Sequence, residues 1–321
     1  MTFDTLVSTF WPSTVNGIVL GSVYALVALG YTLVYGVLSL INFANSEVFM
    51  LAAFGSFFAV DLLGLNVAED PIQTGGSLVG TMLLCLLISV IIGAVSAVVV
   101  ERVAYRPLRK RNSPRLVFLI SAIGASFAIA EAVGVWGPKK REEYALTQYV
   151  KKDEVFSLFS ARVDQTDIVI VLGAFIMAAI LVNFVNRSRV GRGIRAVAQD
   201  AETAKLMGVN VDQIILITFL VGGVMAGGAA FLYMLNTPFA RYDVGFLIGV
   251  KAFTAAVLGG IGNIKGALLG GLLLGLIENY GAALFGSNQN IGTMFSFVAL
   301  VVVLMFRPSG ILGQSMSRNK A

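Results

Sequence analysis

The sequence predicts an all-α fold, a polytopic bundle of about eight or nine transmembrane helices that forms one transmembrane domain over residues 1–321. The first observation is the composition: 57% of the residues are hydrophobic and 13% are charged, whereas about a quarter of the residues in a soluble domain are charged. The second observation is a series of apolar stretches long enough to cross a bilayer. A chain surrounded by lipid needs charged side chains only in its loops, and both observations fit that state.

Apolar stretches follow one another along the whole chain. A hydrocarbon core requires roughly 20 residues of helix, and the stretches close to this length are 14–36, 43–61, 77–99, 116–136, 168–186, 214–236, 267–285 and 291–306. A further stretch, 248–262, is shorter and contains three glycines near its end. We expect a broken or partly inserted helix there, so the chain crosses nine times if this helix spans and eight times if it turns back.

Basic residues indicate the orientation, because cytoplasmic loops of membrane proteins hold an excess of Lys and Arg. The connections 101–115 and 187–213 are strongly basic and are predicted to be cytoplasmic, whereas 61–76 has no Lys or Arg and is predicted to be external. Alternation places the mixed-charge loop 137–167 outside. The amino terminus is therefore expected outside a cytoplasmic (inner) membrane and the carboxyl terminus inside, with no cleaved signal peptide.

The residue types argue against several classes of site. The sequence has no histidine, one cysteine (Cys85) and no G-x-x-x-x-G-K-[ST] phosphate loop, so disulfides, the usual transition-metal sites and ATP hydrolysis are not expected. Glu47, Glu131, Lys251 and Glu278 are too scattered for acid–base catalysis, and the last three are expected to be interhelical partners or interface residues rather than ligands. We predict no catalytic, cofactor-binding or metal-binding residues, no enzymatic activity and no nucleic acid partner.

Two stretches of the chain resemble one another. Val37–Gly55 aligns without gaps on Val257–Gly275, and each copy reads as an apolar helix end, a polar break and a new helix rich in small residues. Transporters are often built from repeats whose interrupted helices face the transport path. An internal repeat with broken helices is therefore predicted, and the alternative is chance similarity between two apolar, glycine-rich stretches.

The polar breaks carry the candidate pathway residues. Polar groups at membrane depth normally face a bundle interior or a water-filled cavity, which assigns Asn42, Asn45, Ser46 and Glu47 to the translocation pathway. The alternative is a cytoplasmic turn in which Asn42 or Asn45 caps the next helix. The second break, with Asn263, leaves the same two interpretations, and the neighbouring Lys265 favours the turn.

Glycines recur at close spacing in two of the apolar stretches. The residues are Gly222, Gly223, Gly227 and Gly228 in one, and Gly266, Gly270, Gly271 and Gly275 in the other. Small residues four apart allow helix backbones to approach closely in lipid. We expect these stretches to pack tightly within one bundle.

The basic connection 187–213 contains a short helix with its own caps. Asp200 is a suitable N-cap, Ala201 to Met207 can form two turns, and Gly208 is a suitable residue after the helix end. A short helix outside the bilayer needs a packing partner. We therefore expect it to dock on a soluble protein.

Several motifs resemble one known family. Glu202, Ala204 and Gly208 have the E-x-A-x-x-x-G spacing of the loop by which ABC importer permeases engage their ATPase subunits. The motifs NGIVLGSVYALVALGYTLVYGVLSLINFANSE, ERVAYRPLR, GRGIRAVAQDAETAKLMGVN, KAFTAAVLGGIGNIKGALLGG and RPSGILG extend the likeness from about residue 16 to residue 313. The chain thus resembles the permease subunits of branched-chain amino acid ABC importers. The family usually has His and Gly where Asn45 and Ser46 stand, which argues against a proton-linked role there.

The resemblance implies a subunit that translocates branched-chain or other neutral amino acids. Its implied partners are ABC ATPase subunits that bind the ATP, a second permease subunit, identical or homologous, and an external substrate-binding protein. It also implies that Asp200, Glu202, Ala204 and Gly208 belong to the ATPase-coupling loop 187–213. The alternatives are a permease of the same family that carries urea or a short amide, and a secondary transporter for a small amphipathic solute.

Overall fold

A computed structural model describes residues 3–65, 72, 75–137, 141–145, 148, 150–151, 154–158, 161–285, 288–307 and 309–313. The helices are α1 (Phe3–Leu38), α2 (Asn45–Leu62), α3 (Gly75–Val100), the π-helix η1 (Glu101–Tyr105), α4 (Arg106–Lys110), α5 (Arg115–Trp136), α6 (Gln165–Arg187), α7 (Arg189–Gln199), α8 (Ala201–Leu206), α9 (Val211–Asn236), α10 (Val244–Gly259), α11 (Ile264–Leu284) and α12 (Gln289–Phe306). The strands are β1 (Tyr144–Ala145), β2 (Glu154–Leu158), β3 (Ala161–Asp164) and β4 (Phe239–Ala240).

The predicted polytopic helical bundle is confirmed. Within the described residues, seven helices are long and apolar enough to cross a membrane. Two shorter apolar helices, Val244–Gly259 and Asn290–Phe306, account for the remaining predicted stretches. α3, η1 and α4 follow one another without interruption, so that one helical rod runs from Gly75 to Lys110.

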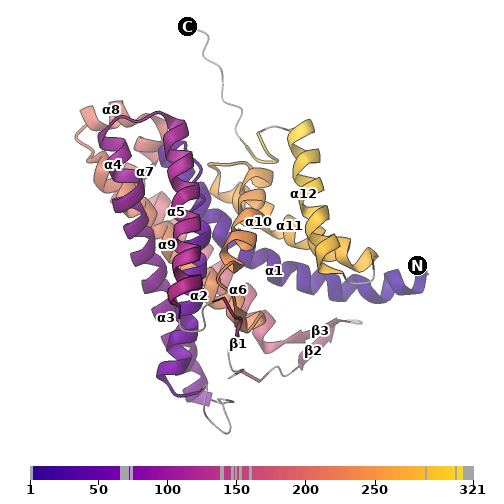
Figure 1. Cartoon of the computed structure of the whole chain (residues 1–321). Coiled ribbons are helices and arrows are strands. Elements are labelled where there is room, and N and C mark those ends of the chain that lie inside the picture. The colour runs from indigo at the N-terminus through magenta and orange to yellow at the C-terminus, as the bar shows by residue number, and fades with distance from the viewer. Residues whose placement is uncertain are drawn as a thin grey trace.

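α1 lies at the centre of the bundle, where residues 23–29 are all buried (Figure 1). It packs against α11 at glycines: a Cβ added to Gly271 would lie 2.4 Å from the Ala25 backbone, and one added to Gly275 would lie 2.3 Å from the Gly17 carbonyl oxygen. α3 and α9 meet in the same way, because a Cβ on Gly93 would lie 2.5 Å from the Gly223 carbonyl oxygen. The predicted close packing of these stretches is confirmed.

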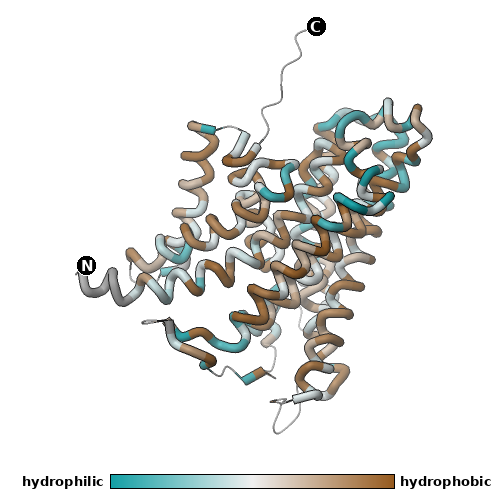
Figure 2. Tube along the Cα trace, turned by 180° about the vertical axis from the view of Figure 1, so that it is seen from behind, coloured by the Kyte–Doolittle hydropathy of each residue, from teal (hydrophilic) through white to brown (hydrophobic). Residues whose placement is uncertain are grey.

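The outer surface of the bundle is apolar. On α3, every fourth residue exposes half or more of its side chain, and the residues are Val79, Leu83, Leu87, Ile91, Val95 and Val99. Seen from behind, hydrophobic residues cover the long helices, whereas hydrophilic residues gather at the end that carries α7 and α8 (Figure 2). Such a continuous apolar face fits contact with lipid.

The two ends of the bundle differ. α4, α7 and α8 lie together at one end, and β1, β2 and β3 lie at the other (Figure 1). β2 and β3 form an antiparallel hairpin, and β1 pairs with β4, which follows α9. The sequence did not predict these short strands in the loop 137–167, where residues 138–140, 146–147, 149, 152–153 and 159–160 are outside the described residues.

Both halves of the sequence echo contain a helix end, a break and a new helix. α1 ends at Leu38 and α2 begins at Asn45, while α10 ends at Gly259 and α11 begins at Ile264. In the ungapped alignment, the ends and the starts of the paired helices each agree within one residue. Descent of the two copies from one repeat stays a prediction.

Candidate functional site

The first break buries all four residues assigned to it by the sequence. Asn42, Asn45, Ser46 and Glu47 are at most 3% exposed. The residue before α2 is Ala44, which has no side chain able to cap, and no side-chain cap bond is present. The alternative that an Asn42 or Asn45 side chain caps α2 is therefore wrong, because the first N–H groups of the helix bond to the backbone carbonyl oxygens of Asn42, Phe43 and Ala44.

Hydrogen bonds from other helices hold this break. The Tyr105 hydroxyl of η1 donates to Asn42 Oδ1 at 3.0 Å. The Ser126 hydroxyl of α5 donates to Glu47 Oε1 at 3.0 Å, and the Ser46 hydroxyl lies 3.3 Å from the same oxygen. Glu47 Oε2 is buried and has no hydrogen-bond partner among the described residues, an arrangement that is expensive for stability alone.

α10 closes the space beside Glu47. A Cβ added to Gly245 would lie 2.9 Å from Glu47 Oε2, and one added to Gly249 would lie 2.2 Å from the Ser46 Cβ atom. The backbone of α10 therefore rests directly on α2 at these two glycines. At these two positions the helices are too close for a further side chain to fit between them.

The second break has a different construction. The Asn263 side chain accepts hydrogen bonds from the backbone N–H groups of Lys265 and Gly266 and caps α11. Its Nδ2 atom donates to the Leu312 carbonyl oxygen at 2.8 Å. The structure thus gives Asn263 a capping role and does not bring it together with the first-break residues; its place in the pathway stays a prediction.

The three ionisable residues Glu131, Lys251 and Glu278 form two different ion pairs. Lys251 of α10 contacts Glu278 of α11 at 2.6 Å and lies beneath the ring of Tyr24 from α1. These two residues are interhelical partners, as predicted. Glu131 instead pairs with Arg141 in the loop that follows its own helix, and both side chains are more than half exposed. Glu131 is therefore not an interhelical partner in this contact, and the other expected role, that of an interface residue, stays a prediction for its position near the end of α5.

The predicted caps of the short helix α8 are both present. Asp200 accepts hydrogen bonds from the backbone N–H groups of Glu202 and Thr203, and bonds from the Thr203 hydroxyl and these N–H groups lower the pKa of its carboxyl. Gly208 has a φ of +84°, and bonds from Gly208 to Lys205 and from Val209 to Ala204 complete a Schellman motif. The local residue types therefore fix where α8 begins and ends.

The tip of α8 exposes apolar side chains at the polar end of the bundle. Leu206 is 87% exposed and Met207 is 80% exposed, while Ala204 is buried against the neighbouring helices. Glu202 is also exposed. Two large apolar side chains in a region rich in charge are typical of a surface that a protein partner covers.

Sequence reasoning missed several residues that build these sites. Tyr105, Ser126, Gly245 and Gly249 contact the first break from three other elements, and only the four-residue spacing of the two glycines hinted at a close helix contact. The amphipathic helix α7 was also missed. Ser188 caps its start by accepting a hydrogen bond from the Gly191 N–H group, and Ile194 and Val197 lie on the buried face of the helix.

Comparison with known proteins places this architecture. The family model described as branched-chain amino acid transport system / permease component matches residues 13–304. The high-affinity branched-chain amino acid transport system permease protein BraD of Pseudomonas aeruginosa is 42% identical over 94% of this chain and 94% of the relative. The corresponding LivH protein of Escherichia coli strain K12 is 39% identical over 93% of this chain and 94% of the relative. The chain belongs to the family of branched-chain amino acid transport system permease components.

Proposed function

We propose that this chain is a membrane-spanning permease subunit of an ATP-binding-cassette importer and passes branched-chain or other neutral amino acids across a cytoplasmic membrane. Its full-length similarity to permeases named for branched-chain amino acid transport supports this proposal. The end that carries α4, α7 and α8 lies in the cytoplasm together with the carboxyl terminus, and the loop 137–167 and the amino terminus lie outside. The excess of Lys and Arg in 101–115 and 187–213 supports this orientation.

The observation that carries the proposal is the exposed tip of α8. Leu206 and Met207 need a cover that neither lipid nor this chain supplies, because they lie among charged residues at the end of the bundle. An ATPase subunit provides that cover, with Asp200, Glu202, Ala204 and Gly208 shaping the coupling helix. The ATPase subunits bind the ATP, since this chain contains no phosphate loop.

The remaining partners are an external substrate-binding protein and a second permease, identical or homologous. In this assembly, movement of α8 separates α10 from α2, and the space between them becomes the pathway lined by Asn42, Asn45, Ser46 and Glu47. The binding protein chooses the solute, and the pathway contributes little to selectivity. The family's usual His and Gly are replaced at Asn45 and Ser46, which leaves urea or a short amide as the second candidate substrate class.

Purification of the complex from its native membrane tests this function. We expect ATPase subunits to co-purify, and ATP hydrolysis in proteoliposomes to rise when a binding protein loaded with leucine is added. Stimulation by a urea-loaded binding protein instead would move the assignment to the second substrate class. Uptake of leucine by the purified chain alone, without any ATPase, would replace the proposal with a secondary transporter.

Substitutions at Gly208 test the docking helix. Replacing Gly208 by Val strains the left-handed backbone by about 1–2 kcal/mol. The variant should still insert in the membrane, but its ATP hydrolysis should be uncoupled from uptake. Gly208→Asn is the matched control, because Asn tolerates this conformation and a Cβ here meets no atom within 4 Å. Glu202→Lys should uncouple as well. Normal uptake in both Gly208→Val and Glu202→Lys would remove α8 from the coupling role.

A further inference from the structure

The segment ERVAYRPLR, Glu101–Arg109, has no part in the function described so far, although it is one of the most distinctive motifs of the chain. Its first five residues form the π-helix η1, which continues α3 and leads into α4. π-helical turns are rare and frequently occur at functional sites, because the extra residue costs stability. Contacts at the two ends of η1 show what this segment joins.

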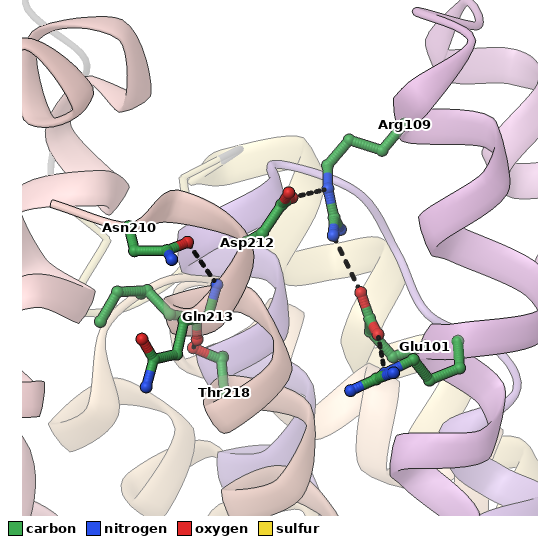
Figure 3. A network of polar contacts seen from close by, with 8 residues as sticks. Glu101, Arg109, Asn210, Asp212, Gln213 and Thr218 are labelled. Atoms are coloured by element: carbon green, nitrogen blue, oxygen red, sulfur yellow. Dashed lines mark hydrogen bonds and ion pairs between the residues drawn. The ribbon is translucent and has the colours of Figure 1, made fainter.

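The cytoplasmic end of the segment is tied to the coupling loop. Arg109 Nε donates to Asp212 Oδ1 at 2.9 Å, and Arg109 Nη2 donates to Glu101 Oε1 at 2.9 Å. Asp212 is the second residue of α9 and comes only four residues after Gly208. Figure 3 shows Arg109 between the two carboxylates, reaching across from its own helix to α9. We therefore expect a displacement of α8 to change the contact between Asp212 and Arg109.

The middle of the segment reaches the first break. Tyr105 is 1% exposed and donates its hydroxyl to Asn42. Its ring packs edge to face against Phe219 of α9, with 5.0 Å between the ring centres. Glu101 and Tyr105 thus belong to one helical turn: Glu101 binds Arg109, which in turn contacts Asp212 of the coupling loop, and Tyr105 contacts the candidate gate.

The two ion pairs of Arg109, one with Asp212 and one with Glu101, differ in how easily they break. Asp212 is 58% exposed, so its ion pair with Arg109 is weak and can exchange with water. Glu101 is 1% exposed, and a buried carboxylate is strongly destabilised when its cation leaves. A cavity of about 330 Å³, lined on one side by Glu101, Arg102 and Arg106 and on the other by the start of α9, leaves space for movement between the two elements.

We propose that η1 and Arg109 form a relay that transmits the position of the coupling loop to the first break. Arg109 and Tyr105 are positioning residues in this relay: Arg109 holds η1 against Asp212, and η1 in turn holds Asn42 through Tyr105. When α8 moves, the ion pair between Asp212 and Arg109 breaks and η1 can shift. The hydrogen bond from Tyr105 to Asn42 is then lost. The link to ATP rests on the proposed function, whereas the mechanical connection between loop and break does not.

Thiol labelling of the purified chain tests the mechanical connection without any ATPase. In a Cys85→Ala background, Ser46→Cys is a nearly isosteric reporter whose reaction with a small water-soluble methanethiosulfonate measures opening of the first break. Arg109→Gln, Asp212→Asn and Tyr105→Phe should each raise the labelling rate by about threefold, a factor within the range of an exposed ion pair. The Asp212→Asn/Tyr105→Phe double variant should label no faster than the faster single variant, because both interrupt one relay.

Matched controls separate this effect from general loosening. Glu154→Gln removes an exposed ion pair in the hairpin and Tyr280→Phe removes a hydroxyl that contacts Thr14, and neither should change the rate. Arg109→Lys keeps the charge but loses the fork that bridges two carboxylates, so it should label at an intermediate rate. Asp212 is at the surface and its Asn variant is expected to fold even if an Arg109 variant does not. Labelling of Asp212→Asn at the control rate overturns the relay.

The assembled transporter tests the link to ATP. In proteoliposomes with its ATPase and a leucine-loaded binding protein, Tyr105→Phe and Asp212→Asn should each raise the ATP hydrolysed per leucine transported by about threefold or more, while Tyr280→Phe keeps the wild-type ratio. An unchanged ratio in both relay variants overturns the link. Failure of any ATPase to co-purify instead refutes the proposed function, and the labelling result on the isolated chain stands apart from it.

Discussion

At the first break, between Leu38 and Asn45, side chains from other helices hold the polar residues, whereas at the second, between Gly259 and Ile264, nearby backbone does so. Tyr105 and Ser126 bind Asn42 and Glu47 inside the bundle. At the second break, the Asn263 cap and the carboxyl-terminal segment act together: the backbone N–H groups of Ile311 and Leu312 donate to the carbonyl oxygens of Leu258 and Gly259.

The difference shows that similar sequence can serve two physical purposes. The second break, which is held by the Asn263 cap and by backbone bonds from the carboxyl-terminal segment, contributes to stability and has few contacts with distant helices. A break held by α5, α10 and η1 changes whenever one of those elements moves, and within the part of the chain that the structure describes it leaves a buried carboxylate oxygen of Glu47 without a partner. The first break is therefore suited to a gate and the second to a fixed joint, and substitutions at each can separate the two roles.

The largest effect is expected at the contact between α10 and the first break. Gly249→Ala places a Cβ 2.2 Å from the Ser46 Cβ atom, in a position that real side chains do not occupy. Overpacking of this kind costs about 1–3 kcal/mol, and the free energy of unfolding should fall by at least that amount in thermal or denaturant unfolding in detergent. Adding Ser46→Gly removes the clashing atom and should restore most of the loss.

Gly36→Ala is the control for this substitution, because a Cβ at Gly36 meets no atom within 4 Å. It should leave stability unchanged or slightly raised. If Gly249→Ala were as stable as Gly36→Ala, the close seat of α10 on the first break would be wrong.

A smaller effect on stability, but a clear one on transport, is expected at Glu47. Glu47→Gln keeps the side-chain shape and the acceptor for Ser126, so unfolding should change by less than about 1 kcal/mol. Uptake should fall by about tenfold or more, since the substitution removes the charge that Glu47 offers to the solute in the proposed pathway. A hydrogen bond to a charged group is worth about 1.5–3 kcal/mol. Glu131→Gln, at an exposed ion pair, should affect neither. Loss of stability in Glu47→Gln with normal uptake would make the first break a structural joint like the second.

Much of the fold followed from the sequence because the deciding features are local. Apolar length predicted the spans, and the residue types at Asp200 and Gly208 predicted both ends of α8. α7 was missed because the two glycines in RVGRGIRAVAQ lower helix propensity, and the packing of Ile194 and Val197 outweighs that local tendency.

The partners of the first break could not be predicted for a different reason. Tyr105 lies 63 residues from Asn42 and Ser126 lies 79 residues from Glu47 along the chain. Only tertiary packing brings such pairs together, so no local pattern identifies them. The sequence did identify which polar residues needed partners, because burying Asn42 or Glu47 without one is expensive.

The smallest effect is expected at the second break and decides between its two interpretations. Asn263→Ala removes the cap of α11 and should lower the free energy of unfolding by about 1 kcal/mol, measured by thermal unfolding in detergent. Asn263→Asp retains the capping oxygen, and Asp is as good an N-cap as Asn, so it should recover most of that loss although the bond from Nδ2 to Leu312 is gone. Leucine uptake by Asn263→Asp should match that of the unmodified protein, because a fixed joint near the surface does not contact the solute. A strong fall in uptake with normal stability would instead place Asn263 in the pathway and make the two breaks functional equivalents, as an inherited repeat would lead one to expect.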